Sequence, residues 1–102
     1  MTMNDFSVII LCYNSKWNAL KQTIDSVLCQ KNISFEIILA DDASTNDCLQ
    51  KAENYLKNRG FLSYKVLAHE QNVGTVQNLT DALEETTGKY VKGIGACDLL
   101  FD

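Results

Sequence analysis

The stretches FSVIILC, at residues 6–12, and FEIILA, at residues 35–40, decide the fold of this protein. Each is a nearly continuous run of β-branched and other apolar residues, which is the pattern of a strand buried on both faces. Between them, apolar residues recur at helical spacing over residues 17–28, with polar residues on the opposite side. Two buried strands joined through one amphipathic helix are typical of a parallel β-α-β unit.

The same alternation continues to the end of the sequence. The further predicted elements are a helix capped by Ser44 and ended by Arg59-Gly60, a strand at 62–68, a helix capped by Asn72 and ended by Gly88, and a strand at 90–94. The order β-α-β-α-β-α-β predicts one α/β domain over residues 1–102. We expect a Rossmann-like parallel sheet of about four strands, with helices on both faces.

Composition narrows the class of protein further. The chain has 102 residues, 46% of them hydrophobic, and a net charge of −4, so nucleic acid is not expected as a partner. No apolar run approaches the ~20 residues of a membrane span, and no signal peptide opens the chain. Its four cysteines (Cys12, Cys29, Cys48 and Cys97) are widely spaced and are interpreted as reduced thiols of a cytosolic protein.

Ligands of open parallel sheets bind beyond the carboxyl ends of the strands, so the residues that follow each strand are the candidates. Asp41 and Asp42 follow the second strand. Asp41 either caps the next helix or contacts a ligand, whereas Asp42, one residue further out, is placed to accept a hydrogen bond from a ligand N–H. After the first strand, Tyr13 either packs on a planar base or covers the sheet end. Asn14 is interpreted first as the cap of the first helix.

The later strands end in two further candidate segments. Asn72 and Gly74 combine a helix cap with a small residue, and exposed amides there suit an anion such as a diphosphate; an ordinary helix entry is the alternative. His69 and Glu70, just before them, are interpreted as a solvated strand exit. Asp98 follows the fourth strand and either holds Mg²⁺ or Mn²⁺, which prefer carboxylate and phosphate oxygens, or caps the next turn.

Four segments of the sequence occur in a recognisable order: SVIILCYN at 7–14, EIILADDAS at 36–44, EQNVG at 70–74 followed by Asn78, and TGKYV at 87–91. Together they resemble the large family 2 of inverting glycosyltransferases with the GT-A fold. The corresponding family motifs read S-V-I-I-P-T-Y-N, E-I-I-V-V-D-D-G-S, N-x-G-x-x-x-N and T-G-E-Y-I. The resemblance covers nearly the whole chain.

This resemblance implies that the chain is the nucleotide-sugar-binding, N-terminal part of such an enzyme, with a UDP- or dTDP-sugar as donor. Tyr13 would then contact the base and Asp42 would accept the N3–H of uracil or thymine. The implied nucleotide-binding loops also contain Asn14, Asp41, Asn72, Gly74 and Asn78. The catalytic base and the groove for a glycan or lipid-linked acceptor are expected downstream, so we expect no turnover by this chain alone.

One motif departs from the family. The aspartate-rich L-D-x-D-D, which would bind Mg²⁺ or Mn²⁺ at the diphosphate, reads IGACD at residues 94–98, and only Asp98 keeps a carboxylate. Cys97 offers a thiol, which is a poor ligand for hard cations. Either Asp98 takes over as the metal ligand or the dependence on metal is lost.

The resemblance places the parent enzyme in cell-surface polysaccharide or glycan synthesis, in the cytoplasm or at the inner face of the membrane. Two other classes stay open at this point: a receiver-like signalling module and a degenerate interaction domain without a ligand. Receivers carry their acidic pair after the first strand, where this chain has Tyr13 and Asn14. If the chain lacks its acceptor half, Leu99, Leu100 and Phe101 are exposed, which predicts self-association.

Overall fold

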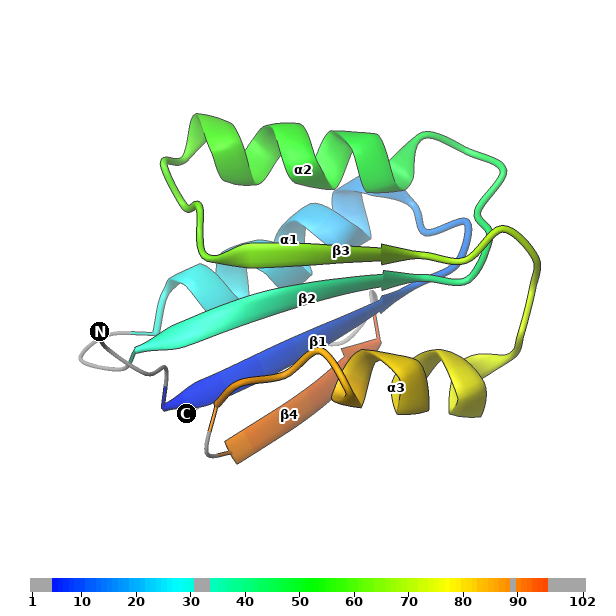
Figure 1. Cartoon of the computed structure of the whole chain (residues 1–102). Coiled ribbons are helices and arrows are strands. Elements are labelled where there is room, and N and C mark those ends of the chain that lie inside the picture. Colours follow the sequence, from blue (N-terminus) through cyan, green and yellow to red (C-terminus); the bar gives the residue numbers. More distant parts are fainter. Residues whose placement is uncertain (1–4, 31–33, 89, 96–102) are drawn as a thin grey trace.

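The computed structural model describes residues 5–30, 34–88 and 90–95. The seven predicted elements form in the predicted order: β1 (Phe6–Cys12), α1 (Trp17–Leu28), β2 (Phe35–Asp41), α2 (Cys48–Asn58), β3 (Tyr64–Ala68), α3 (Thr75–Leu83) and β4 (Tyr90–Gly95). All strands pair in parallel in one sheet of order β3-β2-β1-β4, which confirms the predicted α/β fold (Figure 1). Within the described residues, no helix is long and apolar enough to cross a bilayer.

The helices cover both faces of the sheet, as predicted, because successive strand residues point to opposite sides. On one face, Val8 and Ile10 of β1 join a core cluster with Leu20 and Ile24 of α1 and with residues of α2. On the other face, Ile9 packs in a smaller cluster that receives α3 (Figure 1). The inner strands β1 and β2 are therefore buried on both sides, which explains their continuous apolar runs. The outer strands β3 and β4 keep several exposed residues.

The strand order reverses next to β1. The chain builds β1, β2 and β3 outward in one direction, crosses the opposite face as α3, and returns to pair β4 with the free side of β1. In the register of that pair, Leu11 lies beside Gly95, so β1 and β4 end at the same edge. Reversals of this kind leave a crevice at the carboxyl edge, where ligands bind in doubly wound sheets.

A buried carboxylate closes the opposite, amino edge of the sheet. Glu36 of β2 is 3% exposed, and its Oε2 accepts hydrogen bonds from Ser7 Oγ at 2.6 Å and from the backbone N–H of Thr87 at 2.6 Å. Gly88 N donates to Ser7 Oγ at 2.8 Å, and Lys65 Nζ lies 3.7 Å from Glu36 Oε1. These contacts join β1, β2, β3 and the turn before β4, and so fix where β4 begins.

Two predicted helix starts and one predicted helix end are wrong. Helix α2 begins at Cys48 rather than after Ser44, because Ser44 binds the side chain of Asp41 through both its amide and its hydroxyl. Helix α3 begins at Thr75, and it ends at Leu83 rather than near Gly88. The chain leaves the helix early because Thr87 is held at the amino edge by Glu36.

The cysteines of the described residues are free thiols, as predicted: Cys12, Cys29 and Cys48 form no disulfide. Cys97 lies outside the described residues. Cys12 and Cys48 are both buried, and burial raises the pKa of the Cys12 thiol, with Cys48 and Asp41 adding to the effect. Cys12 and Cys48 therefore act as small apolar core residues.

Candidate functional site

Three of the predicted segments meet at the carboxyl edge of the sheet. Asp42 N donates to Cys12 O at 2.9 Å, which ties the residue after β2 to the end of β1. His69 N donates to Asp41 O at 3.0 Å, which ties the start of the β3–α3 loop to β2. The loops that carry Tyr13, Asp42 and Asn72 therefore emerge side by side, as the parallel topology predicts. Asp98 lies outside the described residues.

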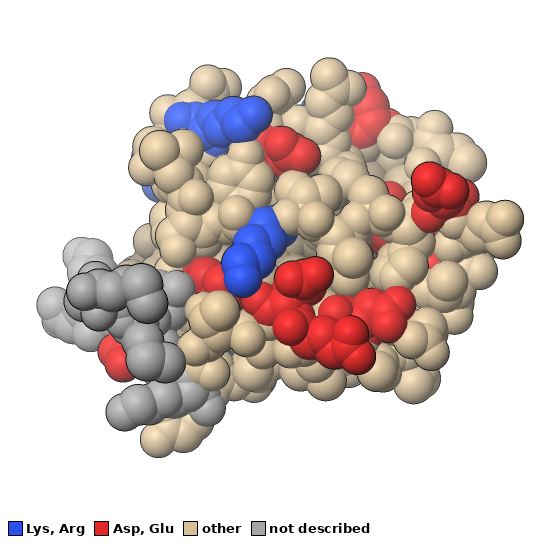
Figure 2. All heavy atoms as spheres, viewed as in Figure 1, with Lys and Arg blue, Asp and Glu red and all other residues tan. Residues whose placement is uncertain are grey.

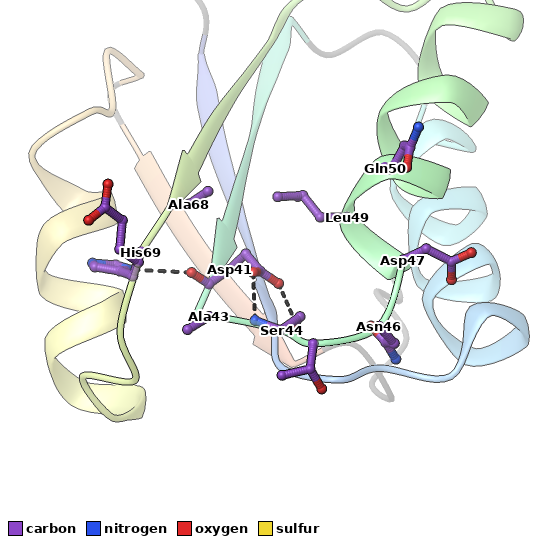
Figure 3. Close-up of a pocket in the computed structure, with 11 residues that line it drawn as sticks. Asp41, Ala43, Ser44, Asn46, Asp47, Leu49, Gln50, Ala68 and His69 are labelled. Carbon is purple, nitrogen blue, oxygen red and sulfur yellow. Dashed lines mark hydrogen bonds between the residues drawn. The ribbon is translucent and has the colours of Figure 1, made fainter.

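Asp41 stabilises the β2–α2 loop and does not cap the N-terminal end of α2. Its carboxylate is buried, with Oδ2 accepting from Ser44 N at 2.9 Å and Oδ1 from Ser44 Oγ at 2.5 Å (Figure 3). The loop turns sharply between them, since Ala43 takes the left-handed conformation with φ 59°. Of the two alternatives for Asp41, the helix cap is wrong, because α2 begins only at Cys48 and its N-cap is Asp47.

Asn14 also serves this loop and does not cap α1. Its Oδ1 accepts hydrogen bonds from Thr45 N at 2.7 Å and Asn46 N at 3.2 Å, and its own N–H donates to Ser44 Oγ at 2.8 Å. The N-cap of α1 is Lys16, whose side chain makes no capping hydrogen bond, so the predicted cap is wrong. Asn14 thus links the loop after β1 to the loop after β2.

Asp42 is the most constrained side chain at this edge. It is 5% exposed; its Oδ1 accepts from Val73 N at 2.6 Å, and its Oδ2 accepts from Gly74 N at 3.0 Å. Two amides of the segment where a diphosphate site was one of two alternatives therefore bind a carboxylate of the protein itself. The nucleotide contacts of Asn72 and Gly74 stay a prediction. Asn72 Nδ2 donates to Asp42 O at 3.3 Å, and the N-cap of α3 is Gly74, so Asn72 does not cap the helix.

Tyr13 and Asn78 differ in how accessible they are. Tyr13 is 57% exposed directly after β1, so its ring is free to meet a planar ligand. Asn78 is 2% exposed on the inner side of α3, where its Nδ2 donates to Ala40 O at 3.0 Å. Asn78 thus supports the end of β2 from the face that α3 covers. Its nucleotide contact stays a prediction.

His69 was interpreted as a solvated strand exit, and this is wrong. Its imidazole is largely buried between two elements. Nε2 lies 2.8 Å from Asp81 Oδ2 on α3, and Nδ1 lies 3.2 Å from Asp41 O at the end of β2. Figure 3 shows His69 beside Asp41. The hydrogen bond to Asp81 raises the pKa of His69. No local sequence pattern pairs residues 69 and 81, because their contact depends on how α3 packs beside the end of β3.

A pocket of about 480 Å³ opens beside this edge (Figure 3). Its walls come from the β2–α2 loop, the first turns of α2 and the end of β3, and they include Asp41, Ser44, Asn46, Gln50 and His69. The lining contains neither Tyr13 nor Asp42. The hollow therefore lies on the α2 side of the predicted base contacts and not over them.

Charge around the site is mostly negative. On the face that carries β3 and α3, acidic side chains gather over α3 (Figure 2). The chain as a whole carries 13 acidic and 9 basic residues. Among the described residues, no group of three or more His, Cys, Asp or Glu side chains is arranged to hold a metal ion.

Fold and site together define a Rossmann-like domain whose acidic pair and exposed tyrosine stand at one sheet edge. Residues 7–96 match the family described as Glycosyl transferase family 2, and the chain belongs to that family. Membership decides against the receiver-like alternative. It also confirms the GT-A resemblance drawn from the four sequence motifs.

Similar proteins cover this chain almost fully but are much longer. EpsE of Bacillus subtilis is 33% identical over 95 residues, which are 93% of this chain and 34% of that protein. A crystal structure of Staphylococcus aureus TarS in complex with UDP-GlcNAc is 32% identical with a TM-score of 0.82, over 93% of this chain and 27% of that one. GalNAc-T7, solved with UDP, GalNAc and Mn²⁺, is 26% identical with a TM-score of 0.78, over 92% of this chain and 18% of that one.

Proposed function

We propose that this chain binds the nucleotide part of a UDP- or dTDP-sugar for a glycosyltransferase. The observation that carries the proposal is the Asp42 carboxylate, which is fixed at the carboxyl edge beside the strand that delivers an exposed Tyr13. Family membership supports it, as do the complexes of one similar protein, TarS, with UDP-GlcNAc and with UDP.

In the proposed complex, each residue of the edge has a separate task. The ring of Tyr13 stacks on the pyrimidine, and Asp42 accepts its N3–H. The other predicted residues act on the loops: Asn14 and Asp41 hold the β2–α2 loop, Asn72 and Gly74 hold Asp42, and Asn78 supports the end of β2.

We propose a divalent cation for this site, with Asp98 as the residue of this chain that would bind it. GalNAc-T7 was solved with Mn²⁺, and carboxylate and phosphate oxygens are the ligands that Mg²⁺ and Mn²⁺ prefer. The described residues alone do not form such a site. The cation would therefore be shared between Asp98 and the diphosphate, where its charge would stabilise the departing nucleotide.

The reaction of the whole protein is proposed from its relatives. We propose that the catalytic base and the site for a glycan or lipid-linked acceptor belong to parts of the parent protein other than these 102 residues, since this chain covers 34% of EpsE and 27% of the TarS chain. We place the parent protein in cell-surface polysaccharide or glycan synthesis, acting in the cytoplasm or at the inner face of the membrane.

Isothermal titration of the chain with UDP, with and without Mn²⁺, tests this function. The Asp42→Ala variant should bind UDP about 1–3 kcal/mol more weakly, because the N3–H of the base is left without its acceptor. Asp5→Ala is the matched control, since Asp5 precedes β1 at the opposite edge of the sheet.

The two failures of this experiment have different meanings. If the wild-type chain binds no nucleotide with or without Mn²⁺, the donor-binding proposal is wrong and the chain is a degenerate domain. If the wild type binds UDP and Asp42→Ala binds it equally well, the nucleotide occupies the edge without the proposed contact.

A further inference from the structure

The Asp42 carboxylate is held at both of its oxygens by two consecutive backbone amides. Val73 N lies 2.6 Å from Oδ1 and Gly74 N lies 3.0 Å from Oδ2. One hydrogen bond would leave the carboxylate free to rotate about its last bond, whereas two bonds from a fixed backbone set its plane. We call residues 73 and 74 the amide clamp.

The clamp depends on the backbone conformation of Gly74. Its φ of 90° and ψ of 159° lie in a region that essentially only glycine adopts. A Cβ at this position would meet nothing within 4 Å, so the space around Gly74 does not require a glycine. The conformation does, because it lets the chain enter α3 while the N–H groups of Val73 and Gly74 both stay on the same carboxylate.

The clamp also leaves Asp42 able to accept a further hydrogen bond. Each carboxylate oxygen can accept about two hydrogen bonds, and the amides take one at each. The neighbouring backbone is fixed as well, because Asp42 N donates to Cys12 O and Asp42 O accepts from Asn72 Nδ2. The direction of the remaining lone pairs is therefore set by the protein before any ligand arrives.

We propose that Gly74 is a positioning residue that determines which base the site accepts, by aiming Asp42 at a ring N–H. This inference rests on the proposed function. Uracil carries a hydrogen on N3, whereas cytosine has a lone pair there that repels a carboxylate lone pair. An aimed carboxylate therefore separates UDP from CDP, two ligands with the same ribose and diphosphate.

The test compares the dissociation constants of UDP and CDP by isothermal titration for three proteins: wild type, Gly74→Ala and Gly60→Ala. Gly60 is the matched control because it also has a positive φ, of 75°, with open space around it, but lies after the C-terminal end of α2. Wild type and Gly60→Ala should prefer UDP. In Gly74→Ala the preference should fall about tenfold, mainly through weaker UDP binding.

A chemical variant distinguishes a lost orientation of the Asp42 carboxylate from general damage to the loop. Ligation at Cys48 allows a synthetic segment with D-alanine in place of Gly74, and a D-residue accepts the positive φ that an L-residue resists. The D-alanine protein should recover the wild-type preference for UDP. If Gly74→Ala does not fold, an ester in place of the Val73 amide deletes one donor of the clamp and should lower the preference instead.

The outcomes distinguish a failure of this inference from a failure of the proposed function on which it rests. Absence of all nucleotide binding by the wild type would remove the proposed function. Wild-type binding of UDP and CDP with equal strength, or a preference that survives in folded Gly74→Ala or in the ester variant, would leave donor binding in place and overturn the role of the clamp.

Discussion

Asp41 and Asp42 are adjacent in the sequence but hold different loops. Asp41 binds Ser44 in the loop that follows its own strand, and Asp42 binds Val73 and Gly74, more than thirty residues away. Successive residues at a strand end point in opposite directions, so two neighbouring carboxylates reach two different neighbours. Each loop of the candidate site therefore depends on one identifiable carboxylate.

At the amino edge of the sheet, position 88 requires glycine because of close packing and not because of its backbone conformation. A Cβ there would lie 2.6 Å from Phe6 C and 2.7 Å from Ser7 N, which are backbone atoms that cannot move aside cheaply. We expect Gly88→Ala to lower the free energy of unfolding by about 1–3 kcal/mol. Urea denaturation monitored by circular dichroism measures the difference.

Gly93→Ala is the matched control for this variant. Its Cβ would meet only Leu79 Cδ1, at 3.3 Å, and the end of a leucine side chain can shift by a few tenths of an ångström. Equal denaturation midpoints for the two variants would show that the turn before β4 is looser than the structure indicates.

At the scale of elements, the sequence predicted the strands better than the helix ends. The runs at 6–12 and 35–40 are apolar enough to identify buried strands, and β1 has the predicted bounds. Ser44 and Asn72 carry the local signal of a helix cap, yet both bind aspartates of the sheet edge. Such contacts depend on which strands become neighbours, which no local pattern encodes.

Helix α3 buries fewer apolar side chains against the sheet than α1 does. Its buried residues are Asn78 and Ala82, compared with Leu20, Ile24 and Val27 in α1. Asp81 adds the contact with His69. A helix with so little buried apolar surface relies more on hydrogen bonds that depend on ionisation.

His69 should therefore titrate above its ordinary pKa of 6.5. Both ring nitrogens face acceptors, Asp81 Oδ2 and Asp41 O, with Asp42 nearby, so only the doubly protonated ring donates to both. Because the folded pKa is raised, the stabilisation is complete below pH 6.5 and is lost as pH rises through the raised value. NMR titration of the only histidine in the chain measures it.

The variant Asp81→Asn should bring the pKa of His69 back toward 6.5, because the partner that raises it most is neutralised. Glu84→Gln is the control, since Glu84 is an exposed carboxylate just after the same helix. An unchanged titration in Asp81→Asn would mean that the contact does not persist in solution.

On the scale of the whole molecule, polar clusters close both ends of an apolar sheet. The carboxyl edge carries Asp41, Asp42 and His69 and offers the candidate site, while Glu36 closes the amino edge. The inner strands β1 and β2 between them are buried on both faces. The family resemblance could be read from the motifs because residues of both edges fall within them, although the motifs do not reveal which members bind one another.

The amino edge sets how the domain responds to acid. Burial alone would raise the pKa of Glu36, but hydrogen bonds from Ser7 and Thr87 and the charge of Lys65 outweigh it and lower the pKa below 4.5. With a lowered folded pKa, the stabilisation is present at neutral pH and is lost as pH falls through that value.

The variant Glu36→Gln should be about 1–3 kcal/mol less stable than the wild type at pH 7 and should lose less stability on acidification. Urea unfolding from pH 7 to about pH 3 tests this, with Glu53→Gln as the control because the carboxylate of Glu53 is paired with the exposed Lys57 and has only a long hydrogen bond, of 3.5 Å, from Tyr64. If wild type and Glu36→Gln lose stability in parallel below pH 4.5, the acid response arises elsewhere in the molecule.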